Sequence, residues 1–322
     1  MSPRWVFEVL VVVALGGNAL LKRGEPLTAE AQRANVQQAA KALAAIVRAG
    51  HGLVVTHGNG PQVGLLALQG ASYKPDEAYP LDVLGAQTEG MIGYMIEQEL
   101  ENALGHDRPV ATLLTQVVVD VHDPAFGKPT KFVGPVYERE EAETRAKAAG
   151  WAIAADGPKW RRVVASPGPM EIPDLRVLKL LLEQGVIVIC AGGGGIPVVR
   201  RGDGSLIGIE AVIDKDAASA LLARQLGADA LLLLTDVDGV YRDFGTERAA
   251  RIAELTVVEA LAFDAPAGSM GPKLRAGSDF AMAGRFTGIG RLEDAIAILD
   301  GRTGTRIITP DEAREEPGGA LV

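Results

Sequence analysis

Val9-Leu10-Val11-Val12-Val13-Ala14-Leu15, followed directly by Gly16-Gly17-Asn18-Ala19-Leu20, is the stretch that decides the fold of this chain. An apolar run without polar alternation predicts a strand that is buried on both faces, as in a parallel sheet. The two glycines after it permit a tight turn and a close approach of backbone N–H groups to a ligand. Ligands bind at the carboxyl ends of strands in open α/β sheets, so this turn is a candidate site. A purely structural glycine turn would give the same pattern, and the remaining sequence decides between the two.

Length and composition indicate a large α/β protein with an aliphatic core. The 322 residues are enough for roughly two domains of ~150 residues or for one large unit. Hydrophobic residues make up 48% of the chain and aromatic residues only 5%, so Ala, Val, Leu and Ile must build the core. The net charge of −9 argues against nucleic acid or an anionic membrane as a partner, because both require a basic surface.

The cysteine count and the hydropathy pattern favour a soluble, cytoplasmic protein. Cys190 is the only cysteine, which excludes an intrachain disulfide and favours a reducing compartment. Glu8 interrupts the apolar run near the N-terminus, and we interpret that run as a strand rather than a signal peptide. No stretch approaches the ~18 consecutive apolar residues of a membrane helix.

A second unit of strand, turn and helix has the same design as the first. Leu53-Val54-Val55 predicts a short buried strand that ends in Thr56-His57-Gly58-Asn59-Gly60-Pro61. Pro61 suits the first turn of a helix, so the N–H groups of the three residues before it would lie at the positive end of that helix. Both turns follow predicted parallel strands, and we therefore expect them at the same edge of the sheet.

The remaining chain alternates helices and strands. Helices are predicted at residues 28–49, 81–104, 174–184, 214–226 and 268–283, and buried strands at residues 186–190 and 230–235. Four consecutive glycines at 192–195 follow one of these strands and indicate a very close backbone approach. Two short strands are expected to close the fold, at residues 295–299 and 306–309.

Residues 117–169 differ in character from the rest. They contain a Pro/Gly-rich loop, a charged helix at about 138–149 and a basic hairpin that turns at Asp156-Gly157. We interpret this segment as a small excursion from the main sheet that would suit a lid. A plain surface insertion would have the same composition.

The common nucleotide and metal motifs are missing. The chain has neither a Walker A pattern nor a G-x-G-x-x-G fingerprint, and its four histidines lack metal-ligand spacing. His57 is a candidate base, but a structural turn histidine fits equally well. Cys190 has no obvious basic partner, so we interpret it as an inert thiol.

The placement of lysines points to anion chemistry. Lys215 and Lys273 each fall in or near the first turn of a predicted helix, where a cation opposes the helix dipole by ~0.3–1 kcal/mol. Both lie next to glycine-rich or Asp-flanked turns, which suggests that an anion occupies the space between them, and Lys131 is a third candidate. Phosphoryl transfer requires such cations beside glycine N–H groups, because its transition state spreads charge over the phosphoryl oxygens. Three solvated surface lysines are the alternative.

Asp216 has two candidate roles. It could accept a proton as a general base, or it could orient Lys215 and Lys273 by ion pairing. The lack of a well-placed His or Glu base favours the second role. An acceptor that is already anionic, such as a carboxylate or carbamate oxygen, needs no deprotonation.

The motifs in combination resemble those of the carbamate kinases, within the amino acid kinase superfamily. They follow the family order from residue 9 to residue 309, and the Thr-His-Gly-Asn-Gly-Pro-Gln stretch at 56–62 is not shared by other members of the superfamily. The matching segments are residues 16–20, 56–64, 87–94, 129–131, 192–197, 212–216, 235–241 and 268–273.

The resemblance implies a three-layer αβα sandwich with a mainly parallel central sheet and a small protruding subdomain at about 117–169. A single amino acid kinase domain would span residues 1–322. Its N-lobe, at 1–212, would bind the phosphoryl acceptor, and its C-lobe, at 213–322, would bind ATP or ADP. A homodimer is also implied, and the predicted helix at 81–104 is our candidate for its interface.

The implied reaction is reversible, Mg²⁺-dependent phosphoryl transfer between ATP and carbamate, which gives carbamoyl phosphate and ADP. Mg²⁺ would be carried mainly by the nucleotide phosphates, without a protein metal ligand. Two alternatives stay open, namely a relative that phosphorylates another small carboxylate and a catalytically silent nucleotide sensor.

The resemblance also implies roles for matching positions. The catalytic group would be Lys131, Lys215, Asp216 and Lys273. The acceptor and the transferred phosphoryl group would be held by Gly16, Gly17, Asn18, Gly58, Asn59 and Gly60. The nucleotide would contact Asp236, Val240, Tyr241, Met270 and Gly271. The family often has Asn-Pro-Thr-Lys-Pro around the first lysine, whereas this chain has Lys128 and Phe132 in place of the Asn and the second Pro. Lys128 could therefore share the role of Lys131.

Overall fold

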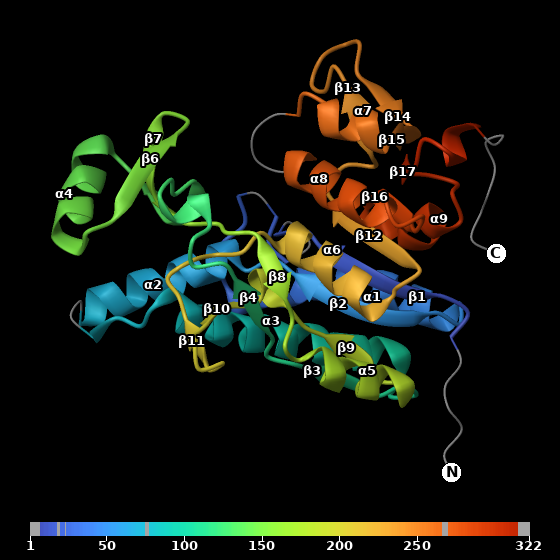
Figure 1. Cartoon of the computed structure of the whole chain (residues 1–322), viewed down its shortest axis with the longest axis horizontal. Coiled ribbons are helices and arrows are strands. Elements are labelled where there is room, and N and C mark those ends of the chain that lie inside the picture. Colours follow the sequence, from blue (N-terminus) through green and yellow to red (C-terminus); the bar gives the residue numbers. More distant parts are fainter. Residues whose placement is uncertain (1–6, 18–19, 23, 75–76, 266–269, 315–322) are drawn as a thin grey trace.

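The computed structural model is organised around one eight-stranded sheet (Figure 1). It describes residues 7–17, 20–22, 24–74, 77–265 and 270–314. The strand order is β15-β17-β16-β12-β1-β2-β9-β3, and every neighbouring pair is parallel except β16 and β17. The strands are β1 (Leu10–Leu15), β2 (Gly52–His57), β3 (Val110–Thr112), β9 (Ile187–Ile189), β12 (Ala230–Thr235), β15 (Glu254–Thr256), β16 (Phe286–Arg291) and β17 (Thr305–Ile308).

β1 lies in the interior of the sheet because both of its faces are apolar. It pairs in parallel with β2 on one side and with β12 on the other. Its alternate residues enter two different cores, with Val11 and Val13 in one and Val12 and Ala14 in the other. All four side chains are fully buried. The structure thus confirms the strand that the uninterrupted apolar run predicted.

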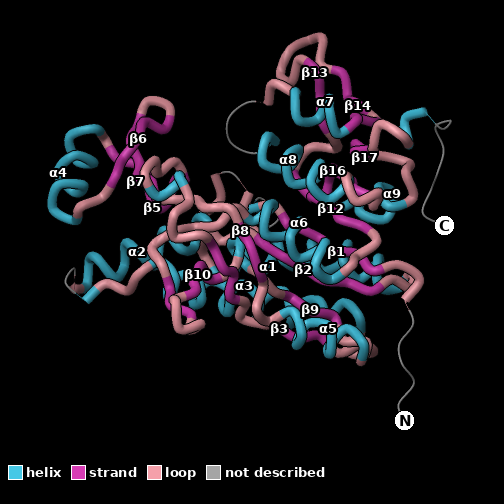
Figure 2. The backbone as a smooth tube through the Cα atoms, viewed as in Figure 1, coloured by secondary structure: helices cyan, strands magenta, loops and turns pink. Residues whose placement is uncertain are grey.

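Helices cover both faces of the sheet and complete three layers (Figure 2). One face carries α1 (Ala29–Arg48), α3 (Leu81–Leu104) and α9 (Ala295–Leu299), and the other carries α5 (Leu175–Glu183), α6 (Lys215–Leu226), α7 (Val257–Ala262) and α8 (Met270–Ala281). Thr28 caps α1 by accepting a hydrogen bond from the N–H of Ala31 at 3.2 Å. These layers confirm the predicted αβα sandwich.

Two smaller sheets and a ribbon extend this body. β11 (Leu206–Gly208), β10 (Ile196–Arg200), β4 (Gln116–Val119) and β8 (Pro169–Glu171) form one sheet, and β5 (Lys131–Tyr137), β7 (Lys159–Val164) and β6 (Ala152–Asp156) form the other. β13 (Val240–Arg242) and β14 (Ala250–Ile252) form the ribbon. Figure 1 shows β6, β7 and the helix α4 (Arg139–Ala149) projecting away from the main sheet, while β5 packs against α2 (Gly60–Tyr73).

The excursion predicted at residues 117–169 therefore has two parts. β4 and β8, at its ends, pair with each other in the four-stranded sheet. Only the middle, from β5 to β7, forms a sheet of its own. None of the helices in the described part of the chain combines the length and the apolar character that a bilayer crossing requires.

The last part of the fold contains a wrong prediction. Residues 295–299, expected as a strand, form α9, and the strand of this region is β16, which the sequence analysis missed. Five apolar residues do not distinguish a short strand from a short helix, and Gly288 and Gly290 weaken the strand pattern of β16. A Cβ on these glycines would lie 2.4 and 2.7 Å from Ile298, so their absence of a side chain lets α9 pack directly on β16. The strand expected at 306–309 is confirmed as β17.

Candidate active site

The carboxyl ends of β1 and β2 bring the two glycine turns together. A Cβ on Gly58, after β2, would touch the Cα of Gly17, after β1, at 3.6 Å. Gly16 lies against β12, since a Cβ there would be 2.8 Å from the carbonyl oxygen of Leu234. Asn18 lies outside the described residues. The two turns therefore form one surface of bare backbone at a single edge of the sheet, as the parallel strands predicted.

The N-terminus of α2 forms the next part of this surface. Asn59 occupies the N-cap position, but its side chain does not cap the helix, and its Nδ2 donates to Thr88 Oγ1 at 2.9 Å. Gly60 is the first residue of α2 and Pro61 follows it. Because no side chain caps this helix end, its first N–H groups are available to an anion.

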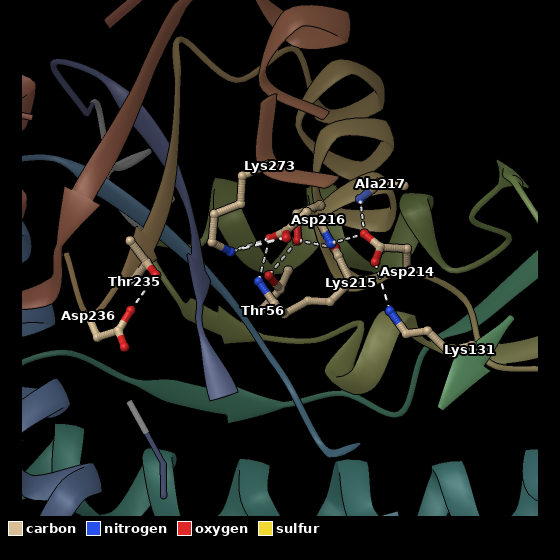
Figure 3. Close-up of polar contacts among 10 residues, drawn as sticks. Thr56, Lys131, Asp214, Lys215, Asp216, Ala217, Thr235, Asp236 and Lys273 are labelled. Carbon is tan, nitrogen blue, oxygen red and sulfur yellow. Dashed lines mark hydrogen bonds and ion pairs between the residues drawn. The ribbon is translucent and has the colours of Figure 1, made fainter. Parts of the chain in front are cut away.

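Two lysines share one buried carboxylate (Figure 3). Lys215 and Asp216 begin α6, and Lys273 lies in the first turn of α8. The Nζ of Lys215 lies 2.5 Å from Asp216 Oδ1, and the Nζ of Lys273 lies 3.1 Å from Oδ2 and 3.2 Å from Oδ1. The ion pairs predicted for Asp216 are confirmed.

Burial and charge act in opposite directions on this cluster. Burial would raise the pKa of Asp216, but the positive charges of Lys215 and Lys273 hold it well below its usual range. Burial lowers the pKa of Lys215 to about 8, with Lys273 acting in the same direction and Asp216 opposing it. Two cations on one carboxylate leave an excess positive charge where little water screens it. The complement of such a cluster is an anionic ligand.

Lys131 reaches the same helix end through Asp214. Asp214 is the N-cap of α6, and its Oδ1 accepts hydrogen bonds from the N–H groups of Asp216 and Ala217 at 3.0 and 3.2 Å. Its Oδ2 lies 2.8 Å from the Nζ of Lys131. Burial would raise the pKa of Asp214, but the charge of Lys131 contributes to holding it below its usual value. Lys131 is the first residue of β5, so the three-stranded sheet of β5, β7 and β6 supplies this cation. Lys128, the other candidate, is exposed.

A pair of hydroxyl groups joins the turn after β2 to the lysine cluster. The Oγ of Ser219, in α6, donates to the carbonyl oxygen of Lys215 at 2.7 Å. Thr56, in β2, lies 2.6 Å from the same Oγ and is buried with it. The turn that follows β2 is therefore tied to the first turn of α6.

The residues expected at the nucleotide follow β12 and begin α8. Asp236 comes directly after β12, and Tyr241 lies in β13. Val240 is fully buried, so its side chain belongs to the core and is not presented to a ligand. Met270 and Gly271 open the helix that carries Lys273. This group of residues is thus joined to the lysine cluster through α8.

A cavity of about 500 Å³ lies beside this region, but the lysines of the cluster do not line it. Its walls come from α1, from Lys22 before that helix, and from the carboxyl ends of β12 and β16 with the residues that follow them. They carry charges of both signs, including Asp236 and Arg291. Among the predicted site residues that the structure describes, Asp236 lies on its wall. Fixed charges, rather than the size of a cavity, stabilise a transferring phosphoryl group, so the lysine cluster remains the candidate for the chemistry.

Three further residues of this region, Thr88, Glu89 and Asp214, had no predicted role. Thr88 and Glu89 are 0% and 1% exposed on α3. The carboxyl of Glu89 accepts the N–H groups of Gly192 at 2.8 Å and Thr115 at 3.1 Å, and burial raises its pKa to about 8 against the effect of these bonds. Thr88 and Glu89 are adjacent polar residues within the helix predicted at 81–104, and this polar pair was the signal that could have identified them. For Asp214, the signal was an Asp directly before a helix.

Two other candidates lack the properties that catalysis would require. The Nδ1 of His57 lies 3.1 Å from the carbonyl oxygen of Gly58, and burial lowers the pKa of this ring to about 4. A ring of such low basicity is a poor proton acceptor near neutral pH. Cys190 is fully buried, and burial raises the pKa of its thiol well above its usual range, which makes it unreactive.

Comparison with known proteins gives a consistent result. Residues 9–288 match the sequence profile of the amino acid kinase family. The chain is 57% identical over 300 residues to a carbamate kinase from Rhizobium meliloti, a match that covers 92% of both proteins. It is 51% identical over 298 residues to a carbamate kinase from Escherichia coli K12, covering 92% of this chain and 98% of the relative.

Solved structures agree with the sequence relatives. A carbamate kinase from Giardia lamblia bound to AMP-PNP superposes with a TM-score of 0.86 at 41% identity, covering 94% of this chain and 98% of the other. An N-acetylglutamate synthase from Neisseria gonorrhoeae, at 16% identity and a TM-score of 0.56, shares the fold alone.

Proposed function

We infer the function from one premise: this chain belongs to the amino acid kinase family and, within it, to the carbamate kinases. It is an ATP-dependent kinase that acts on carbamate. The reaction joins a phosphoryl group to a carbamate oxygen and releases ADP, and the reverse reaction makes ATP from carbamoyl phosphate.

The observation that carries this function is the pair of buried lysines on Asp216. The transition state of phosphoryl transfer is loose and anionic, and catalysis depends on positioning and on fixed positive charge. Lys215 and Lys273 supply that charge at 2.5 and 3.1 Å from a carboxylate that holds them in place. Asp216 is a poor proton acceptor because both lysines stabilise its ionised form. A carbamate oxygen is already anionic, so the reaction needs no base.

The glycine turns supply the acceptor side of the proposed site. Gly16, Gly17 and Gly58, together with the N-terminal N–H groups of α2, offer hydrogen-bond donors without side chains in the way. Gly60 begins α2 beside these turns, and Asn18, which follows Gly17 in the sequence, would complete the same group. Asn59, fixed by Thr88, would orient the acceptor.

The remaining roles follow from position. Lys131 would stabilise the transferred group from the projecting sheet, with Asp214 holding it near α6. The nucleotide would lie along the segment after β12 and the start of α8, near Asp236, Tyr241, Met270 and Gly271, with Val240 supporting that segment from the core.

Mg²⁺ would arrive on the nucleotide phosphates, where it neutralises their charge. Asp216 is already paired with two lysines, and this donor set suits phosphate oxygens better than a bare cation.

We further propose that the protein is a cytoplasmic homodimer that pairs through α3. Met91 and Tyr94 expose 37% and 54% of their surface on this helix, and the nearby Leu114 exposes 52%. Light scattering of wild type and of Tyr94→Lys tests the pairing, with a dimeric mass expected for the first and a monomeric mass for the second. Equal masses for wild type and Tyr94→Lys would contradict this interface. The cytoplasmic location is tested separately, by cell fractionation.

The test of the function is an assay that couples ATP formation to ADP, carbamoyl phosphate and Mg²⁺. Purified protein is expected to form ATP, and the rate should depend on both substrates. Absence of turnover with carbamoyl phosphate, together with turnover of another acyl phosphate, would contradict carbamate as the acceptor.

A further inference from the structure

The loop at residues 191–195, after β9, lies between the acceptor turns and the N-terminus of α6. A Cβ on Gly193 would lie 2.1 Å from the Nδ2 of Asn59, and a Cβ on Gly194 would lie 2.3 Å from the carbonyl oxygen of Ile213. The loop therefore contacts Asn59 on the acceptor side and Ile213, directly before Asp214, on the lysine side. The position of this loop therefore sets how the acceptor turns align with the lysine cluster.

The backbone of this loop needs external support. Gly193, Gly194 and Gly195 have φ values of 67°, 100° and 83°, and Ala191, a fully buried residue with a Cβ, has a φ of 50°. The left-handed region is unfavourable for alanine. Such a conformation persists only where surrounding contacts hold it.

Glu89, on α3, provides that support. Its Oε1 accepts the N–H of Gly192 at 2.8 Å, and its Oε2 accepts the N–H of Thr115 at 3.1 Å. Thr115 in turn holds both ends of the loop, because its Oγ1 accepts the N–H of Ala191 at 3.1 Å and its carbonyl oxygen accepts the N–H of Ile196 at 2.8 Å. Without Glu89, two buried N–H groups would lose their partners.

We propose that Glu89 is a positioning residue for the phosphoryl acceptor, because it holds the 191–195 loop against Asn59 and thereby aligns the acceptor turns with the lysine cluster. Thr88 acts on the same target, since its hydroxyl accepts a hydrogen bond from Asn59 at 2.9 Å. Thr88 thus fixes Asn59 directly, and its neighbour Glu89 fixes Asn59 through the loop. This inference rests on the proposed function, which assigns the acceptor to these turns.

The surroundings of Glu89 favour its neutral form. Asp174, the N-cap of α5, raises its pKa in addition to burial, and the buried thiol of Cys190 lies near both carboxyls. The ring of His57 also lies against Gly192, and burial lowers its pKa, which keeps it neutral. Glutamine is therefore a close match in shape and charge, but its –NH₂ would face one of the two N–H donors, so that only one bond survives.

Glu89→Gln is the test, with Glu99→Gln as its matched control. Glu99 is also buried on α3, but it pairs with Arg33 at 3.1 Å. We expect Glu89→Gln to raise KM for carbamoyl phosphate about tenfold through the lost bond and the shifted loop. The Kd of ADP should stay within about twofold, because the nucleotide elements lie in another part of the chain. Glu99→Gln should change neither constant.

A second readout does not depend on the reaction. Hydrogen exchange of the peptide covering residues 188–196 should accelerate in Glu89→Gln and stay unchanged in Glu99→Gln. If Glu89→Gln does not fold, Thr88→Val keeps the buried shape and should raise KM for carbamoyl phosphate alone.

The possible results distinguish a failure of this inference from a failure of the proposed function. A wild-type KM in Glu89→Gln, or an equal loss of ADP and carbamoyl phosphate binding, would overturn the inference, as would unchanged hydrogen exchange. A wild-type KM in Thr88→Val would overturn it as well where Glu89→Gln does not fold. If the wild-type protein itself shows no turnover, the proposed function fails instead, and hydrogen exchange still tests whether Glu89 holds the loop.

Discussion

The two halves of the proposed active site are built by opposite means. The acceptor half consists of glycine turns that leave the backbone bare: a Cβ on Gly16 would lie 2.8 Å from the carbonyl oxygen of Leu234, and a Cβ on Gly17 or Gly60 would enter open space. The phosphate half consists of charged side chains at two helix N-termini, where Lys215 and Lys273 share Asp216. The first half is shaped by leaving side chains out, and the second by burying charge. Mutations in the acceptor half should therefore weaken acceptor binding, and mutations in the phosphate half should lower kcat.

Removal of a lysine from the phosphate half should produce the largest effect. Lys215→Ala and Lys273→Ala are each expected to lower kcat about 10³-fold, because each removes a fixed charge that acts on the transition state. Lys179→Ala, on an exposed position of α5, is the control and should behave as wild type. Steady-state rates of ATP formation measure the effect. A wild-type kcat in both active-site variants would show that phosphoryl transfer takes place elsewhere.

In the acceptor half, Gly193→Ala should lower kcat/KM for carbamoyl phosphate by about 100-fold, because a displacement of ~1 Å at a positioning group has effects of that order. Its φ of 67° disfavours alanine, and the added Cβ would lie 2.1 Å from Asn59. Gly202→Ala, where no atom lies within 4 Å of the added Cβ, is the control. The distinction between the halves breaks down if ADP binding, measured by calorimetry, weakens as much as acceptor use.

The pH dependence should report on the phosphate half. Burial lowers the pKa of Lys215 to about 8, so this lysine is charged below that pH and neutral above it. The kcat/KM for ADP should therefore fall on the alkaline side, by about tenfold per pH unit above pH 8. Lys215→Arg should remove this alkaline limb, because a guanidinium stays charged. A wild-type profile that is flat from pH 7 to pH 10 would contradict this assignment.

The smallest effect is expected for Lys131→Ala, on the free energy of unfolding. Its side chain is 36% exposed beside Asp214, and an ion pair of that kind contributes less than about 1 kcal/mol to the free energy of unfolding. Asp216→Asn, in contrast, should cost about 3 kcal/mol because it leaves two buried lysines without a counter-charge. Urea denaturation compares the two variants. Equal losses would mean that both ion pairs are equally buried in solution.

Local patterns predicted most of the fold and the charged half of the site. The apolar run of β1 needs no partner to be recognised, and α3 begins and ends at the residues predicted for that helix. Lys215 and Lys273 could be found because each lies beside a helix start or a glycine turn, which are signals of a few residues. Asp216, next to Lys215, follows from the same pattern.

The parts that were missed depend on contacts between distant segments. Glu89 binds the N–H of Gly192, 103 residues away, and Lys131 pairs with Asp214, 83 residues away. β16 was missed because its glycines make room for Ile298 of α9, a tertiary contact that weakens the local strand pattern. No short window of sequence contains both partners of the Glu89–Gly192 pair or of the Lys131–Asp214 pair, so only the folded chain reveals these two contacts.

The most direct test of the account is the binding of ADP and Mg²⁺ with and without aluminium fluoride, an analogue of the transferring phosphoryl group, in wild type and Lys215→Ala. If the lysines act on the transition state, the variant should lose about 10³-fold in affinity for the fluoride complex and only a few-fold for ADP alone, as expected for differential binding. Calorimetry measures both constants on one protein preparation. An equal loss in the two titrations would contradict the account, because the lysines would then serve nucleotide binding rather than phosphoryl transfer.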